Sequence, residues 1–250
     1  MKLSSLQKTL SMLDVLGEAP AGGLSVTALS KLTGFPGSSV HHMLSTLKDN
    51  GYVSQNPETK KYALGFKFLT LSRKVLDTFD LRQIAAETLR ELNRNTGETV
   101  FLSILRGNRV LFIDRIQAQE AKFPLATDIG FTSEPHASSS GKVLLSELPV
   151  DQIMAMYPKE ELTVFGPRTI SSRTALFHHL ETVRASGYAI DDEEYYLGIR
   201  CIAAPVRAGG AIRASVSITG SVFTMTLEAI TNSLVPQVKE AASRISAMLV

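Results

Sequence analysis

The stretch SVTALSKLTGFPGSSVHHMLSTLKDNGYV, residues 25–53, decides the fold of the first part of the chain. Ser25 is suited to cap a helix that ends at Gly34, and after a short break Ser38 is expected to start a second helix that ends at Gly51. Two amphipathic helices joined by a turn of three to four residues are typical of the helix-turn-helix motif. The apolar faces of the two helices are formed by Val26, Leu29 and Leu32, and by Val40, Met43, Leu44 and Leu47.

The sequence on either side completes a winged module. Apolar residues at helical spacing predict a helix over residues 4–17 ahead of the motif. After it, two short apolar segments flank the turn residues 56–59, which predicts a β-hairpin. A hairpin directly after the second helix of the motif is a wing, so residues 1–65 are expected to form a winged helix-turn-helix domain. A further helix is expected over residues 66–80, with an apolar stripe made of Phe66, Leu69, Leu76 and Phe79.

The helix that starts at Ser38 offers a polar face to DNA. Its apolar side packs on its own domain, which leaves Ser38, Ser39, His41, His42 and Ser45 on the other sides for the major groove. Lys60 and Lys61 in the wing are expected to reach the DNA backbone or the minor groove. The alternative is an ordinary solvent-exposed helix face. A metal site at the two histidines is disfavoured, because adjacent helical residues point about 100° apart.

Charge is distributed unevenly along the chain. Residues 1–75 carry nine Lys and Arg against four Asp and Glu, whereas the remaining 175 residues carry 17 against 20. A balance of +5 followed by one of −3 is the pattern expected when a DNA-binding module is joined to a domain with another task.

Residues 81–250 are expected to form an α+β domain. Strands are predicted at 100–105 and 110–116, at 188–190, and in a hairpin of 201–206 with 212–219. Helices are predicted from Asp80, over 141–148 and 150–157, from Ser172 to Ser186, and from Leu227 to the end with a possible kink at Pro236. Helices would therefore flank a mostly antiparallel sheet.

Composition excludes several classes of protein. No apolar run approaches the length of about 18 residues that a membrane span needs. Cys201 is the only cysteine, which excludes an internal disulfide framework and a multi-cysteine zinc site. We therefore expect a cytoplasmic protein with no metal, no cofactor and no membrane partner.

The chain resembles the IclR (isocitrate lyase regulator) family of bacterial transcription regulators from about Leu6 to Ile245. The N-terminal segments that carry this likeness are SLQKTLSMLDVL, the stretch quoted above and KKYALG. The C-terminal segments are GETVFLSIL, PHASSSGKVLL, RTISSRTAL, GYAIDDEEYYLGIRCIAAPV and SVSITG. The resemblance implies a GAF-like effector domain, a homodimer or dimer of dimers on a palindromic DNA operator, and control of a catabolic operon, more often by repression. It also implies an effector that is a small organic acid or an aromatic metabolite.

The resemblance implies effector contacts as well. Carried over to this chain, they are Ser139, Ser140, Asp191, Cys201, Ser217 and Thr219. Two features of the sequence agree with this. Ser217 and Thr219 alternate with apolar residues and so share one face of a strand. Ser139 and Ser140 precede a predicted helix, where free backbone amides favour a carboxylate.

Each of these residues also has a simpler interpretation. Ser139 or Ser140 could only cap the helix, Cys201 could be a small buried hydrophobe, and the acidic run after Ile190 could be a solvated loop. The polar triplet Ser138-Ser139-Ser140 favours a hydrophilic effector that is multiply hydroxylated or carboxylated.

The DNA-binding helix departs from the family pattern at two positions. Family members commonly carry a basic residue at the position of Gly37 and an arginine at that of His42. Their absence predicts weaker non-specific DNA binding with a shallower salt dependence.

Two other classes of function are less well supported. Ser139 and Lys142 fit a Ser-x-x-Lys pattern of acyl-transferring enzymes, but the companion motifs are absent. A winged helix that binds protein is disfavoured by the positive charge of residues 1–75.

Overall fold

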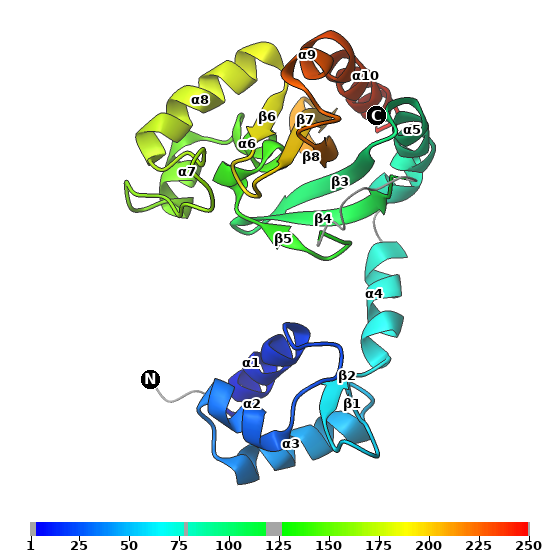
Figure 1. Ribbon diagram of the computed structural model, residues 1–250, viewed down its shortest axis with the longest axis vertical. Coiled ribbons are helices and arrows are strands. Elements are labelled where there is room, and N and C mark those ends of the chain that lie inside the picture. Colours follow the sequence, from blue (N-terminus) through cyan, green and yellow to red (C-terminus); the bar gives the residue numbers. More distant parts are fainter. Residues whose placement is uncertain (1–3, 78–79, 119–126, 250) are drawn as a thin grey trace. The chain divides into compact units, whose positions relative to one another are not determined.

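The computed structural model describes residues 4–77, 80–118 and 127–249, and it divides the chain into two compact units, residues 1–78 and 79–250 (Figure 1). The division falls within the predicted helix 66–80, whose Phe79 lies outside the described residues. No helix within the described ranges is long and apolar enough to cross a membrane.

The first unit is a winged helix-turn-helix domain followed by one more helix. Ser25 caps the second helix through its side chain, and Gly34 ends that helix in the left-handed conformation, as the sequence predicts. The third helix begins at Gly37, one residue earlier than expected, because Pro36 already has the φ angle that suits a helix start. The elements are α1 (Ser5–Gly17), α2 (Val26–Thr33), α3 (Gly37–Asp49), β1 (Val53–Gln55), β2 (Tyr62–Leu64) and α4 (Lys67–Asp77).

One apolar core holds these helices and the wing together. Met12, Leu29, Val40 and Leu44 are its fully buried members, and the wing joins it through Tyr62. Tyr62 also exchanges two backbone hydrogen bonds with Leu24, so the wing is anchored ahead of α2 as well as after α3.

The second unit is built on a six-stranded antiparallel sheet with the strand order β5-β4-β3-β8-β7-β6. The sequence predicted most of its strands, but it missed β5, a two-residue strand that pairs with residues 110–111 and has no periodicity of its own. The strands are β3 (Thr99–Arg106), β4 (Arg109–Ile116), β5 (Thr132–Ser133), β6 (Ala189–Asp192), β7 (Ile199–Ala208) and β8 (Ala211–Ser221).

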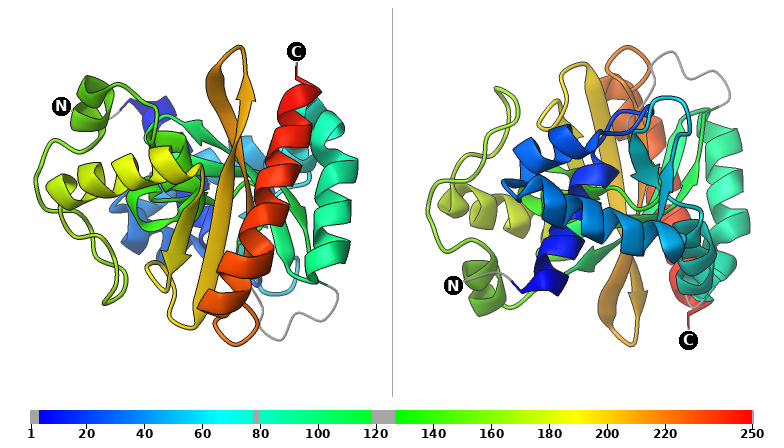
Figure 2. Two further views of the ribbon diagram at one scale, coloured as in Figure 1. Left: turned by 90° about the horizontal axis from the view of Figure 1, so that it is seen from above. Right: turned by 90° about the horizontal axis from the view of Figure 1, so that it is seen from below.

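Helices cover both faces of this sheet (Figure 2). The helices α5 and α10 pack on one face, over an apolar core that includes Leu89, Val216 and Val238. The helix α6 packs on the opposite face and is itself covered by α7 and α8. These elements are α5 (Asp80–Thr96), η1 (Pro135–Ala137), α6 (Ser139–Leu145), α7 (Val150–Met156), α8 (Arg173–Ser186) and α10 (Val235–Ala247).

The last helical segment has an irregular turn just before Pro236, where the sequence suggested a kink. The short α9 (Leu227–Ala229) passes into a π turn (Ile230–Leu234) before α10 begins, with Pro236 in the first turn of α10. Proline has no N–H and its ring clashes with the carbonyl four residues earlier, so a wider turn just before it relieves both problems.

Candidate DNA interface and effector site

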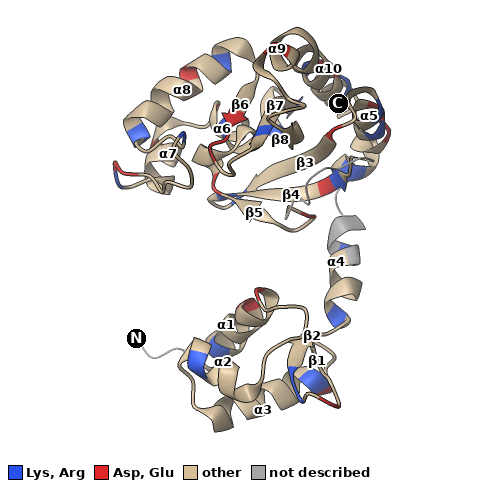
Figure 3. Ribbon diagram, viewed as in Figure 1, with Lys and Arg blue, Asp and Glu red and all other residues tan. Residues whose placement is uncertain are grey.

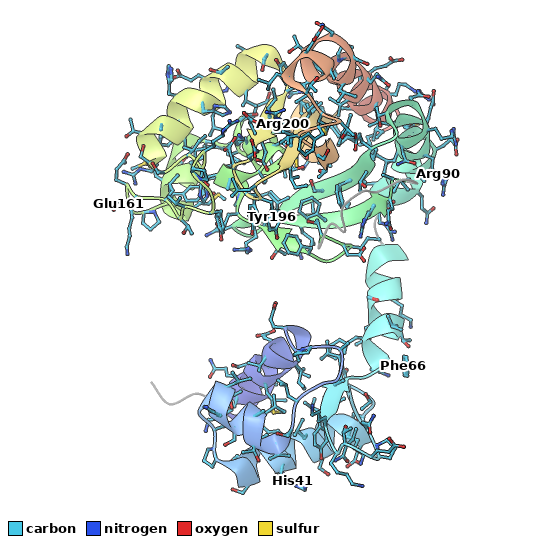
Figure 4. All side chains as sticks on the ribbon, viewed as in Figure 1. His41, Phe66, Arg90, Glu161, Tyr196 and Arg200 are labelled. Atoms are coloured by element: carbon cyan, nitrogen blue, oxygen red, sulfur yellow. The ribbon has the colours of Figure 1, made fainter. Side chains whose placement is uncertain are left out.

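The solvent-facing side of α3 carries the predicted DNA contacts. Val40, Met43, Leu44 and Leu47 are buried, as expected, and they turn the opposite side of the helix outward. Ser38, His41, His42 and Ser45 are exposed and Ser39 is half-buried. Figure 4 labels His41 at the outer edge of this unit. The hydroxyls of the three serines have no hydrogen-bond partner within the described part of the chain, so they are free to meet phosphates or base edges.

A shallow depression adds a basic residue that the sequence did not reveal. It has a volume of about 370 Å³ and is lined by Ser5, Lys8, Ser38, Ser39, His42 and Met43. The Lys8 ammonium lies 5.7 Å from the centre of the Phe35 ring. Lys8 thus brings a positive charge from α1 to the first turn of α3, near the positions where basic residues were expected and are missing.

The wing presents Lys60 and Lys61 at its turn, and both are exposed. Figure 3 shows basic residues on the hairpin of β1 and β2. The side-chain oxygen of Asn56 accepts hydrogen bonds from the backbone amides of Glu58 and Thr59, and these bonds fix the shape of the turn. Lys60 has a φ of 57° and its carbonyl accepts a hydrogen bond from the Gln55 side chain.

The predicted effector residues gather on the α6 face of the large sheet. Strand register places Asp191 opposite Cys201 and Cys201 opposite Thr219, while Ser217 lies between Ala203 and Phe101. Directly opposed residues of antiparallel strands share a face. Ser139 and Ser140, from α6, are buried against the same region. The structure thus brings the four sheet residues together in two neighbouring rows.

The position of the serines relative to α6 differs from the prediction. Ser139 and Ser140 lie inside its first turn. Ser138 is the N-cap, and its Oγ accepts a hydrogen bond of 3.2 Å from the backbone amide of Gly141. Neither serine is therefore the cap. The helix starts two residues earlier than expected because the capping role falls on the first serine of the triplet.

Three serines of this region have hydroxyl groups without a partner in the described part of the chain. Ser139, Ser140 and Ser217 have no side-chain hydrogen bond to any residue that the structure describes, although each is almost fully buried. Thr219, by contrast, donates to the Cys201 sulfur at 3.3 Å. The oxygens of the three serines are not among the fully buried side-chain atoms that lack a partner within the described ranges, so solvent still reaches them and a polar ligand could take its place.

A buried ion pair underlies the site. Lys142 is completely buried, and its ammonium donates to the Ile190 carbonyl and to the Glu194 carboxylate. Asp191 is also buried, and its carboxylate accepts a hydrogen bond of 2.8 Å from the backbone amide of Glu194. The acidic run is therefore not a solvated loop at these two positions. Because Lys142 binds Glu194, it is not free to act as a base for Ser139.

Burial shifts the pKa values of this cluster. Loss of water raises the pKa of Asp191 to about 7 although the Lys142 charge lowers it, and burial also raises that of Glu194. Burial, followed by the charge of Asp191, raises the pKa of the Cys201 thiol. Burial and the nearby Lys142 lower the pKa of His179 to about 4.

We expect Asp191 to make folding stability fall as pH rises. Between about pH 4 and pH 7 the folded chain keeps a proton on Asp191 that the unfolded chain releases, so its favourable contribution is complete below pH 4 and lost above pH 7. Asp191→Asn should flatten the pH dependence of unfolding free energy and raise stability at pH 8 by up to about 4 kcal/mol relative to wild type. Urea unfolding at pH 5 and pH 8 measures this, and identical profiles for both proteins would contradict it.

Comparison with known proteins matches both units to described families. Residues 5–57 match the IclR helix-turn-helix domain, and residues 73–247 match the bacterial transcriptional regulator IclR C-terminal family. Both families are transcription regulators and not enzymes.

Individual relatives extend over most of the chain. The regulator XynR of Escherichia coli is 39% identical over 204 residues, which cover 82% of this chain and 80% of XynR. The crystal structure of Thermotoga maritima IclR superposes with a TM-score of 0.78 at 30% identity and covers 98% of each chain. An IclR homolog from Microbacterium hydrocarbonoxydans, complexed with 4-hydroxybenzoate, has the same fold, with a TM-score of 0.83 at 22% identity over 98% of this chain and 99% of that one.

Proposed function

Because the chain belongs to the IclR family of bacterial transcription regulators, we propose that it represses a catabolic operon in the cytoplasm and that a small carboxylate effector controls its hold on DNA. The GAF-like domain of residues 81–250 binds the effector, the domain of residues 1–65 binds the operator, and residues 66–80 link them. The observation that carries the proposal is the solvent-facing polar side of α3, in the same domain as a wing with two exposed lysines.

The DNA contacts we propose are Ser38, Ser39, His41, His42 and Ser45 of α3, with Lys60 and Lys61 of the wing. All but Ser39 are exposed, and Ser39 lines the depression that also holds Lys8. The serines and histidines reach base edges and phosphates in the major groove, and the lysines hold the backbone.

We propose that two copies bind a palindromic operator as a homodimer, or four copies as a dimer of dimers. Apolar side chains on α1 and at the start of α4 are unusually exposed. Leu6 and Leu10 of α1 are 68% and 53% accessible, and Phe66, just before α4, and Leu69, within it, are 82% and 65% accessible. A second copy would remove them from water. The side chains of Leu76 and Phe79, also predicted for the α4 stripe, lie outside the described residues.

The effector site we propose comprises Ser139, Ser140, Asp191, Cys201, Ser217 and Thr219. The unpartnered hydroxyls of the three serines supply hydrogen bonds to a polar ligand, and the structural relative with bound 4-hydroxybenzoate has the same fold. The effector must bind the DNA-competent and DNA-incompetent states with different affinity. Half-sites lie about 34 Å apart, so a shift of a few ångströms between the DNA-binding units of a dimer weakens operator binding.

The test is fluorescence anisotropy with DNA from upstream of the gene and its neighbours, at two salt concentrations. We expect sequence-specific binding that weakens with salt, and His42→Ala should reduce specific affinity about tenfold, since one lost contact is worth roughly 1–3 kcal/mol. His178→Ala, an exposed histidine of the second unit, is the matched control and should bind as wild type. Equal loss in both variants, or no specific site, would count against the proposed interface.

A further inference from the structure

Arg115 lies on the effector face of the sheet, although nothing in the sequence pattern marks it. It is directly opposite Phe101 in the β3–β4 pair, and Phe101 is directly opposite Ser217 in the β3–β8 pair. Arg115, Phe101 and Ser217 therefore form one row on one face, continuing the row that contains Ala203. Asp114, the preceding residue, belongs to the opposite face, where it pairs with Arg82 of α5.

The Arg115 guanidinium is largely buried, and within the described ranges it lacks the hydrogen-bond acceptors that a buried cation normally has. Its side chain is 14% exposed, and it donates no hydrogen bond to any residue in the described ranges. Its Nε is fully buried and has no acceptor. The carboxylate of Asp128 approaches only to 3.7 Å and is itself 73% exposed, and the guanidinium lies 5.9 Å from the centre of the Phe101 ring.

This arrangement is costly unless a ligand completes it. Arginine carries five N–H donors in a fixed fork, and a buried cation normally binds an anion or several acceptors. Two other arginines of the sheet have such partners: Arg109 binds Glu134 and Thr132, and Arg200 binds Asp192. Arg115 differs from these two in lying in the same row as Ser217 on the effector face.

We propose that Arg115 is a specificity-determining residue that binds the carboxylate of the effector. The inference rests on the proposed function, and it names the class of effector as a small hydroxylated monocarboxylic acid. The carboxylate meets the guanidinium in the two-bond geometry that arginine provides, and the body of the acid lies over Phe101 toward Ser217. Neighbouring strands are about 4.8 Å apart, so the Cα atoms of Arg115 and Ser217 are separated by roughly 10 Å. The two side chains shorten the gap between their polar groups, so a small acid can contact both.

The charges of the site fix the orientation of the acid. Asp191 and Glu194 lie at the β6 side of the sheet, and their one described cation, Lys142, is bound to Glu194. A second carboxylate placed there would find Lys142 already paired and would make ionisation of Asp191 still less favourable. The carboxylate of the ligand therefore lies at Arg115. Its hydroxyl groups lie near Asp191, Cys201 and Thr219, with which they exchange hydrogen bonds.

D-gluconate is the probe, and D-glucitol, which has CH₂OH in place of the carboxylate, is its neutral counterpart. We expect gluconate, but not glucitol, to bind the full-length wild-type protein in calorimetry. Arg115→Gln should weaken gluconate binding by about ten- to a hundredfold, the range expected for charge-assisted hydrogen bonds, and Arg115→Lys should retain part of it. Arg82→Gln removes an arginine from the opposite face and should bind gluconate as wild type.

Three results would overturn the inference: equal gluconate affinity in Arg115→Gln and wild type, equal binding of gluconate and glucitol, or no binding of either gluconate or 4-hydroxybenzoate to wild type. Operator binding by the unliganded Arg115→Gln protein separates this failure from failure of the proposed function. It should match wild type, with only the response to the acid lost.

Discussion

Gly141→Ala is expected to destabilise the second unit by about 3 kcal/mol or more, at the upper end of the cost of overpacking a core. An added Cβ at this position would lie 2.2 Å from both the Cα and the carbonyl oxygen of Pro135. That backbone cannot move freely, because the His136 amide donates to the Tyr157 hydroxyl and the His136 ring bonds the Thr163 carbonyl. The helix α6 would therefore have to separate from the segment that precedes it.

Thermal unfolding measures this effect, and the melting temperature should fall by roughly 10 °C, since 1 kcal/mol corresponds to about 2–4 °C in a domain of this size. Ser140→Ala, one residue earlier in the same helix, and Gly17→Ala, where an added Cβ meets nothing within 4 Å, are the controls. Both should change stability little. If the Gly141→Ala protein has the same melting temperature as the two controls, the close contact between Gly141 and the Pro135 backbone does not limit stability.

Lys142→Met is expected to cost about 3–5 kcal/mol of unfolding free energy, the usual penalty for leaving a buried charge without its partner. The ammonium holds the Ile190 carbonyl and the Glu194 carboxylate, and it is the nearest described cation to Asp191. The loss should be larger at pH 8 than at pH 5, because the two carboxyl groups can take up protons at the lower pH. Urea unfolding at both pH values measures it.

The double variant Lys142→Met/Glu194→Gln should recover part of the loss, because it removes one of the two stranded charges. Arg207→Gln, which breaks the exposed pair with Glu147, is the matched control and should cost less than about 1 kcal/mol. If Lys142→Met resembles Arg207→Gln at pH 8, the buried pair does not support the fold.

The local features of this fold could be predicted from sequence because they depend on neighbouring residues. Ser25 caps its helix and Gly34 ends it, as predicted, and the helix predicted from Ser172 to Ser186 is present with Ser172 as its cap. Features that need distant residues could not be predicted in this way. The strand β5 has only two residues, and the partners Lys142 and Glu194 are 52 positions apart.

The same distinction between local and distant residues separates the site residues that were predicted from those that were missed. Alternation in β8 correctly placed Ser217 and Thr219 on one face, because a strand has a period of two. The capping role within the serine triplet was assigned one or two residues late, since three identical residues give no local signal for the first. Lys8 and Arg115 were missed because only the packing of α1 on α3 and the register of β4 with β3 place them at the sites.

The two faces of the large sheet have different roles, one in the core and one at the candidate effector site, and this has an evolutionary consequence. The face under α5 and α10 is mostly apolar and holds the main core of the fold, whereas the face toward α6 carries the serines, Thr219, Asp191 and Arg115. Strand alternation places residues of the two kinds next to each other in sequence but on separate surfaces in space. Paralogues can therefore diverge toward new metabolites by exchanging every second residue of a strand, and the same alternate positions are where a biosensor with altered selectivity would be built.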